Sequence, residues 1–225
     1  MSKGKLIVIE GTDGSGKKTQ TAKLVERLNA EHVATETIDF PRYGTPSCYF
    51  VEKYLHGGYG TSYEVNAYAG SLFYSLDRYD HSAQMKETLA AGKTIICDRY
   101  TSASMGHQAG KIDDLKERDT YLEWLYKMEY ETFNIPKPDI TILLYVSPEI
   151  NQKLMAQRED KEYLKGKKQD IHEADIKHLI KASEAFLYVA KKYGWAVVDC
   201  APDGTLLSIE EIHNKIWDKV SSMVK

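Results

Sequence analysis

The chain has 225 residues, of which 42% are hydrophobic and 28% are charged, and its formal net charge is −3. This balance excludes an intrinsically disordered chain, and the slight negative charge argues against a protein that binds nucleic acid through a basic surface. The longest apolar run, Ile140–Val146, is too short to span a bilayer. The start of the chain has no signal-peptide pattern, and three widely separated cysteines indicate reduced thiols, so we expect a cytoplasmic protein without a membrane partner.

Five segments are predicted to be strands. Four of them are short apolar runs with the continuous hydrophobicity expected of parallel strands that helices cover on both faces. In chain order the segments are Leu6–Ile9, Thr35–Phe40 (the weaker candidate), Thr94–Cys97, Ile140–Val146 and Ala196–Val198. Three of the strong runs are closed by an acid, at the edge where open α/β sheets place their chemistry: Glu10, Asp98 and Asp199.

Helical patterns separate the predicted strands. The clearest are an apolar stripe over residues 176–190, which Gly194 is placed to end, and a capping box at Ser208–Glu211 that begins the last helix. Residues 120–133 are also predicted to be helical. The alternation of strands and helices predicts one doubly wound α/β domain over residues 1–225.

The strongest motif follows the first strand and opens the first helix. It reads Gly11-Thr12-Asp13-Gly14-Ser15-Gly16-Lys17. Glycines permit the backbone conformations in which successive N–H groups converge on phosphate oxygens, and the helix N-terminus and Lys17 add positive charge. The motif therefore indicates a phosphate-binding loop.

Lys18 departs from the usual form of this loop. Its position normally holds Ser or Thr, whose hydroxyl ligates Mg²⁺, and an ammonium group cannot coordinate a cation. Three interpretations stay open. Magnesium is held through water and other groups, Thr19 takes a nearby role, or the chain binds nucleotide without efficient transfer.

Three further motifs narrow the class of protein. They are Phe40-Pro41-Arg42, Phe73-Tyr74-Ser75-Leu76-Asp77-Arg78, and the run from Asp98-Arg99-Tyr100 to Gln108. With the phosphate loop, their order and spacing closely resemble the thymidylate kinase family from the N-terminus to about Gln108. The resemblance implies a three-layer P-loop NTPase fold, with a five-stranded parallel sheet flanked by helices, and a homodimer. It also implies ATP-dependent phosphorylation of dTMP to dTDP with Mg²⁺.

The resemblance implies roles for individual residues as well. ATP would bind to Gly11, Thr12, Asp13, Gly14, Ser15, Gly16, Lys17, Lys18 and Thr19. The acceptor dTMP would bind to Asp13, Phe40, Arg42, Tyr74, Arg78, Arg99, Ser104 and Gln108. The catalytic residues would be Lys17, Asp98, Arg99 and Arg158, and Asp98 would position the metal.

Local chemistry fits several of these roles. Tyr74 and Arg78 are four residues apart, so they share a helix face suited to stacking on a base and donating to a carbonyl of thymine or uracil. Asp98 ends a buried strand, where a carboxylate can position magnesium or its waters. The planar fork of Arg99 suits an acceptor phosphate.

Two assignments rest on less specific patterns. Either Arg42 or Tyr43 would face the acceptor phosphate. Residues 156–172 are polar and lysine-rich, and they are predicted to form a basic lid in which Arg158 is the only arginine. Closing such a lid would place positive charge on the transferring group and exclude water.

Two alternatives stay open beside this function. One is a related P-loop kinase with another nucleoside or nucleotide acceptor. The other is a non-catalytic nucleotide-binding protein, which the lysine at position 18 motivates. A GTP switch is disfavoured, because the chain has no Asn-Lys-x-Asp motif.

Overall fold

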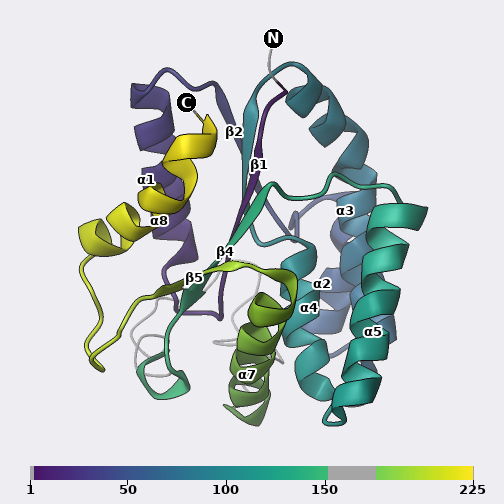
Figure 1. Cartoon of the computed structure of the whole chain (residues 1–225). Helices are drawn as coiled ribbons and strands as arrows, with labels where there is room; N and C mark the ends of the chain where they lie inside the picture. The colour runs from purple at the N-terminus through teal and green to yellow at the C-terminus, as the bar shows by residue number, and fades with distance from the viewer. Residues whose placement is uncertain (1–2, 152–175, 225) are drawn as a thin grey trace.

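The computed structural model describes residues 3–151 and 176–224, and a five-stranded sheet lies at its centre (Figure 1). The strands are β1 (Leu6–Glu10), β2 (Thr35–Asp39), β3 (Thr94–Asp98), β4 (Ile140–Tyr145) and β5 (Ala196–Asp199). They are parallel and lie in the order β2-β3-β1-β4-β5. All five predicted strands are confirmed, with small shifts at their ends.

Helices cover both faces of this sheet. They are α1 (Lys17–Ala30), α2 (Tyr49–Leu55), α3 (Ala67–Ala90), α4 (Thr101–His107), α5 (Leu115–Lys127), α7 (Ile176–Tyr193) and α8 (Ile209–Val224). Short 3₁₀ turns occur at Pro46–Cys48 and Ala109–Lys111, and a π turn at Met128–Thr132 follows α5. In Figure 1, α1 and α8 lie on one side of the sheet and α3, α4, α5 and α7 on the other, so the predicted three-layer arrangement is confirmed.

The central strand β1 is buried along its whole length and divides its side chains between two cores. Ile7 and Ile9 pack with α1 and α8, whereas Leu6 and Val8 pack with Met85 of α3. This explains why the strand reads as continuously apolar rather than alternating.

Two predicted helix ends are confirmed and a third is not. Ser208 and Glu211 form the capping box of α8, with the Ser208 N–H donating to the Glu211 carboxylate at 2.8 Å, and Gly194 follows α7 with φ 68°. The helix predicted over 120–133 begins earlier, at Leu115, because Asp114 accepts a bond from a backbone N–H of the first turn. It also ends earlier, since the π turn replaces its last part.

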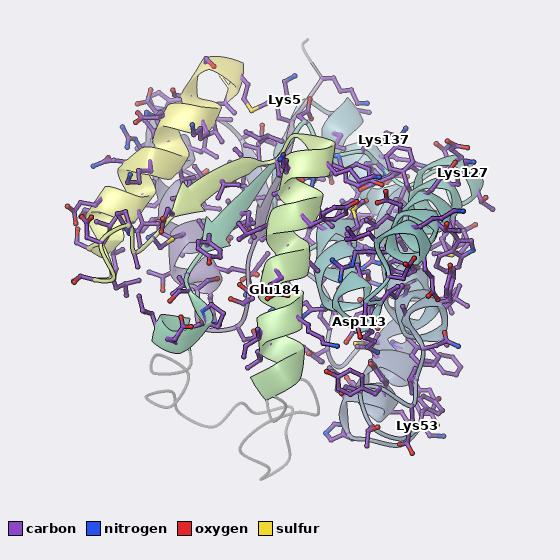
Figure 2. The ribbon with its side chains drawn as sticks, turned by 60° about the horizontal axis from the view of Figure 1, so that its bottom comes forward. Lys5, Lys53, Asp113, Lys127, Lys137 and Glu184 are labelled. Carbon is purple, nitrogen blue, oxygen red and sulfur yellow. The ribbon has the colours of Figure 1, made fainter. Side chains whose placement is uncertain are left out.

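Helix α7 packs closely against α4. An added Cβ at Gly106 of α4 would lie 2.3 Å from the ring of Phe186, which explains the glycine at this contact. At the surface, Lys181 of α7 pairs with Asp113 at 2.7 Å, and Glu184 projects from the exposed side of the helix (Figure 2). Within the described part of the chain, no helix is long and apolar enough to cross a bilayer.

Candidate active site at the carboxyl edge of the sheet

The phosphate loop joins β1 to α1 at the carboxyl edge of the sheet. Gly14 and Gly16 have φ values of 95° and 87°, which side chains rarely adopt, and Gly16 precedes the first residue of α1. Gly11 is required for a second reason, since an added Cβ would lie 2.6 Å from the carbonyl oxygen of Leu144 in β4. The glycine spacing read from the sequence therefore has a steric cause at each of these three positions.

Lys17 is folded back over the loop. Its Nζ donates to the carbonyl oxygens of Gly11 and Thr12, both at 3.0 Å, and lies 3.8 Å from the Asp13 carboxylate. Burial lowers the pKa of Lys17 to about 8, and the neighbouring guanidinium of Arg99 acts in the same direction. The ammonium is therefore held where a nucleotide phosphate can replace its backbone acceptors.

Arg99 follows β3 and reaches the phosphate loop. Its φ is 67°, an uncommon value for a residue with a side chain. Its guanidinium donates to Asp13 at 2.7 Å and lies 3.0 Å from Nε2 of His107 and 3.5 Å from the Glu10 carboxylate. Burial alone lowers the pKa of Arg99, but the carboxylates of Asp13 and Glu10 outweigh burial and raise it, so the group stays charged. The structure thus brings the predicted residues Asp13 and Arg99 together.

Glu10 belongs to this cluster, although no role is predicted for it from the sequence. Its carboxylate accepts from the Gly11 N–H at 2.9 Å and from the Ser102 hydroxyl at 2.7 Å. Burial raises the pKa of Glu10, and the charge of Arg99 opposes this increase. The available signal was its place at the end of a buried strand, beside the phosphate loop.

Asp98 lies at the end of β3, opposite Asp39 of β2 in the register of the sheet. Burial raises the pKa of Asp39, the Asp98 charge adds to the increase, and the Lys18 ammonium opposes it, so both neighbouring charges act on Asp39. Among residues 3–151 and 176–224, no group of three or more His, Cys, Asp and Glu side chains could form a complete metal cage. Mg²⁺ in nucleotide sites is normally held by one or two carboxylates together with phosphates and water, and Asp98 fits that donor set.

A second set of predicted residues meets on α3. The predicted residues Tyr74 and Arg78 share a face of this helix, and Gly70, for which no role is predicted from the sequence, lies four residues before Tyr74 on the same face. The Oε1 atom of Gln108 lies against Gly70, 2.6 Å from where a Cβ would stand, and the Ser104 hydroxyl accepts from Arg78 at 3.1 Å. Arg78, Ser104 and Gln108 are nearly inaccessible to solvent, and Oε1 of Gln108 has no hydrogen-bond partner within the described ranges. Arg78 of α3 and Gln108 after α4 thus offer a buried donor and a buried acceptor, the two kinds of group that pair with the edge of a base.

The segment after β2 places its two polar candidates differently. Arg42 turns toward α3 and bonds to both the side chain and the carbonyl of Asp77, to Asp80 at 2.5 Å, and to Ser47 at 2.7 Å. Tyr43 is 37% exposed and lies close enough to Arg99 to affect its pKa. Arg42 therefore anchors the segment, and Tyr43 is the one of the two that lies near Arg99.

The remaining predicted residues have simpler surroundings. Phe40 is buried and packs 5.6 Å from the ring of Tyr100, measured between centroids. Thr19 is exposed at the start of α1. Arg158 and the predicted lid at 156–172 lie outside the described residues.

Asn151 is a further residue that sequence reasoning missed. It lies in the turn of helix that follows β4, and its Nδ2 donates to the Thr12 hydroxyl at 2.9 Å. Both side chains are buried, so this bond ties the phosphate loop to the segment after β4. The pairing joins residues 139 positions apart, which no local pattern encodes.

Comparison with known proteins agrees with this geometry. A family model described as thymidylate kinase matches residues 9–216. The thymidylate kinase of Plasmodium falciparum is 28% identical over 221 residues, which cover 98% of this chain and 91% of that protein. The thymidylate kinase of Schizosaccharomyces pombe is 28% identical over 222 residues, covering 99% of this chain and 94% of that protein. A solved structure of thymidylate kinase from Candida albicans has the same fold, with a TM-score of 0.75 at 24% identity over 99% of this chain and 93% of that one.

Proposed function

Since this chain belongs to the thymidylate kinase family, we propose that it phosphorylates dTMP to dTDP with ATP as the phosphoryl donor. One observation carries the proposal. Residues 99–104 contact both the phosphate loop and α3. Arg99 donates to Asp13 of the loop, and Ser104 accepts from Arg78 of α3. This arrangement supports a site for the phosphoryl donor ATP near Arg99 and a site for the acceptor dTMP near Ser104.

At the ATP site, the protein positions the phosphates of ATP and neutralises part of their charge. The N–H groups of the glycine loop and the N-terminus of α1 suit the nucleotide phosphates, and Lys17 exchanges its backbone acceptors for phosphate oxygens. Arg99 lies between the loop and the acceptor side, where its remaining donors suit the acceptor phosphate. No general base is needed, because a monophosphate oxygen is already nucleophilic at neutral pH.

On the acceptor side, Tyr74 offers a ring for stacking, and Arg78 and Gln108 offer a donor and an acceptor. The 4-carbonyl of thymine accepts a bond from a guanidinium, and the N3–H of thymine can donate to Oε1 of Gln108, which has no partner among residues 3–151 and 176–224. Cytosine presents an amino donor in place of this carbonyl, so we expect the site to bind cytosine much more weakly than thymine.

Magnesium is the cofactor that we propose for this reaction. When bound with ATP it would neutralise charge on the transferring phosphates. Asp98 would hold the ion or its waters, with Asp39 opposite it in the sheet, while Lys18 would supply no ligand and instead offset the negative charge of Asp39.

A coupled assay of ADP formation tests the proposal. We expect Mg²⁺-dependent turnover with dTMP, weaker turnover with dUMP, turnover with dCMP that is measurable but far weaker still, and none with deoxynucleosides. Turnover only with another acceptor would indicate the related-kinase alternative. ATP binding without turnover on any acceptor would indicate the non-catalytic alternative, and the substitution Lys18→Thr should then create activity.

We further propose that the protein is a homodimer that pairs through α3. Leu72, Leu76 and Tyr79 are 39%, 42% and 51% exposed, and they form one outward stripe on this helix. The substitution Leu76→Glu should therefore lower the mass measured by light scattering to that of a monomer. Leu115→Glu on α5 is the matched control, because Leu115 is at least as exposed, at 57%, but lies off this stripe.

The remaining proposals rest on the sequence patterns and on the family. We propose that residues 1–225 form one domain that acts in the cytoplasm on small nucleotides, with 156–172 as a basic lid. Arg158 would then stabilise charge in the transition state. The substitution Arg158→Ala should lower kcat at least about a hundredfold while leaving the dissociation constant for dTMP within about twofold.

A further inference from the structure

We propose that Glu129 is a positioning residue that sets the base specificity of the acceptor site by fixing the guanidinium of Arg78. This inference rests on the proposed function, in which Arg78 donates to the pyrimidine. Glu129 does not fall in any of the motifs that carry the family resemblance. Glu129 lies in the π turn that follows α5, and its carboxylate bonds to the edge of the Arg78 guanidinium formed by Nε and NH2.

The Glu129 carboxylate is completely buried and holds four donors. Its Oε2 accepts from Arg78 Nε and from the Thr101 hydroxyl, both at 2.8 Å. Its Oε1 accepts from the second arm of Arg78 (the NH2 group) and, at 2.7 Å, from the Ser75 hydroxyl. With α3 and α4 each supplying a hydroxyl, the plane of the carboxylate is fixed, and the bidentate pair fixes the guanidinium in turn.

The other edge of Arg78 faces α4. A guanidinium has five N–H donors, and Glu129 takes the edge formed by Nε and NH2. NH2 also donates to Ser104, while the only acceptor of NH1 in the described part of the chain is the Tyr100 carbonyl at 3.3 Å. One N–H of NH1 is therefore left for a substrate carbonyl.

The ion pair changes what Arg78 can recognise. Burial alone lowers the pKa of Arg78, but Glu129 outweighs burial and raises it, so the arginine remains a cation whose charge is balanced in place. Because Glu129 neutralises the charge of Arg78 and holds its guanidinium in place, Arg78 presents the base with an N–H donor of fixed direction. It therefore binds a base with a carbonyl at the matching position and cannot turn away from a base that places an amino donor there.

The backbone around Glu129 supports a special role. The Phe133 N–H bonds to the Met128 carbonyl at 2.8 Å, five residues back, in place of the usual α-helical pairing. Such π turns are uncommon and frequently occur at functional sites. Lys127, labelled in Figure 2, marks the end of α5, and the change in helical geometry begins directly after it.

The test compares acceptors in three variants of the full chain. Glu129→Gln keeps the shape of the side chain and removes its charge, and Thr101→Val removes one donor that orients the carboxylate. Glu131→Gln is the matched control, because Glu131 lies in the same π turn but is exposed. For each, kcat/KM is measured for dTMP, dUMP and dCMP, together with KM for ATP and the melting temperature.

We expect Glu129→Gln to lower the ratio of kcat/KM for dTMP over dCMP by about tenfold or more, mainly through KM for dTMP, with KM for ATP within about twofold. Thr101→Val should shift the ratio in the same direction by less, and Glu131→Gln should leave it unchanged. A lower melting temperature with an unchanged ratio in both Glu129→Gln and Thr101→Val would show a structural role only and overturn the inference. If Glu129→Gln does not fold, an unchanged ratio in Thr101→Val alone overturns it. Absence of dTMP turnover in the unsubstituted chain would instead refute the proposed function.

Discussion

The protonation of Lys17 gives the sharpest test of the donor site. Burial places its pKa at about 8 rather than near its ordinary value of 10.5. Only the protonated ammonium attracts nucleotide phosphates. The protonated fraction falls from about nine-tenths at pH 7 to about one-tenth at pH 9, so kcat/KM for ATP should fall about tenfold over this interval.

Stability should change in the opposite direction. Because the pKa of Lys17 is lower in the folded chain than in the unfolded one, the unfolded chain binds more protons between about pH 8 and pH 10.5. The contribution of Lys17 to the free energy of unfolding therefore rises with pH while its contribution to ATP use is lost. General alkaline damage would lower both together.

The assay is a pH profile of kcat/KM for ATP at saturating dTMP, with kcat/KM for dTMP at saturating ATP as the internal comparison. The substitution Lys17→Met should give much lower activity, at least about a hundredfold, and a profile without a descending limb near pH 8. A limb with the same midpoint in Lys17→Met, or no limb in the unsubstituted chain, would refute the reasoning.

Three further substitutions test single contacts. Arg42→Ala should leave the buried carboxylate of Asp77 without its cation, held only by the Ser47 hydroxyl and the backbone N–H of residue 42, and cost about 3 kcal/mol of stability, with little change in KM for dTMP. A large rise in that KM at unchanged stability would instead place Arg42 at the acceptor. Asn151→Ala removes the buried bond to Thr12, so we expect a loss of about 1 kcal/mol and a KM for ATP raised several-fold, and an unchanged KM would contradict this. Gly70→Ala places a methyl group 2.6 Å from the Gln108 oxygen and should raise KM for dTMP but not for ATP, and equal effects on both would argue against a base site here.

Most of the fold could be predicted from the sequence, because its signals are local. Buried parallel strands appear in the sequence as apolar runs, and the capping box at Ser208 marks the start of α8. The family resemblance, based on four motifs in order, is confirmed by a family match over residues 9–216. The early start of α5 was missed because its cap, Asp114, stands before residues with no clear apolar stripe.

The parts of the site that were missed depend on distant pairs. Glu129 and Arg78 are 51 positions apart, and Asn151 and Thr12 are 139 positions apart, so each looks unremarkable in its own segment. Arg42 shows the converse problem. It stands in a recognised motif, yet its orientation is decided by Asp77, on a helix whose packing the motif does not specify.

The position of β1 in the middle of the sheet has a consequence for the time course of folding. This strand is the first to be synthesised, but its partners in β3 and β4 lie about 90 and about 130 positions further along the chain. Until those strands emerge from the ribosome, four apolar residues and Glu10 stay without the neighbours that bury them. The phosphate loop, although encoded in the first seventeen residues, therefore takes its shape late, and chains that stop before β4 should be targets for chaperones rather than partial enzymes.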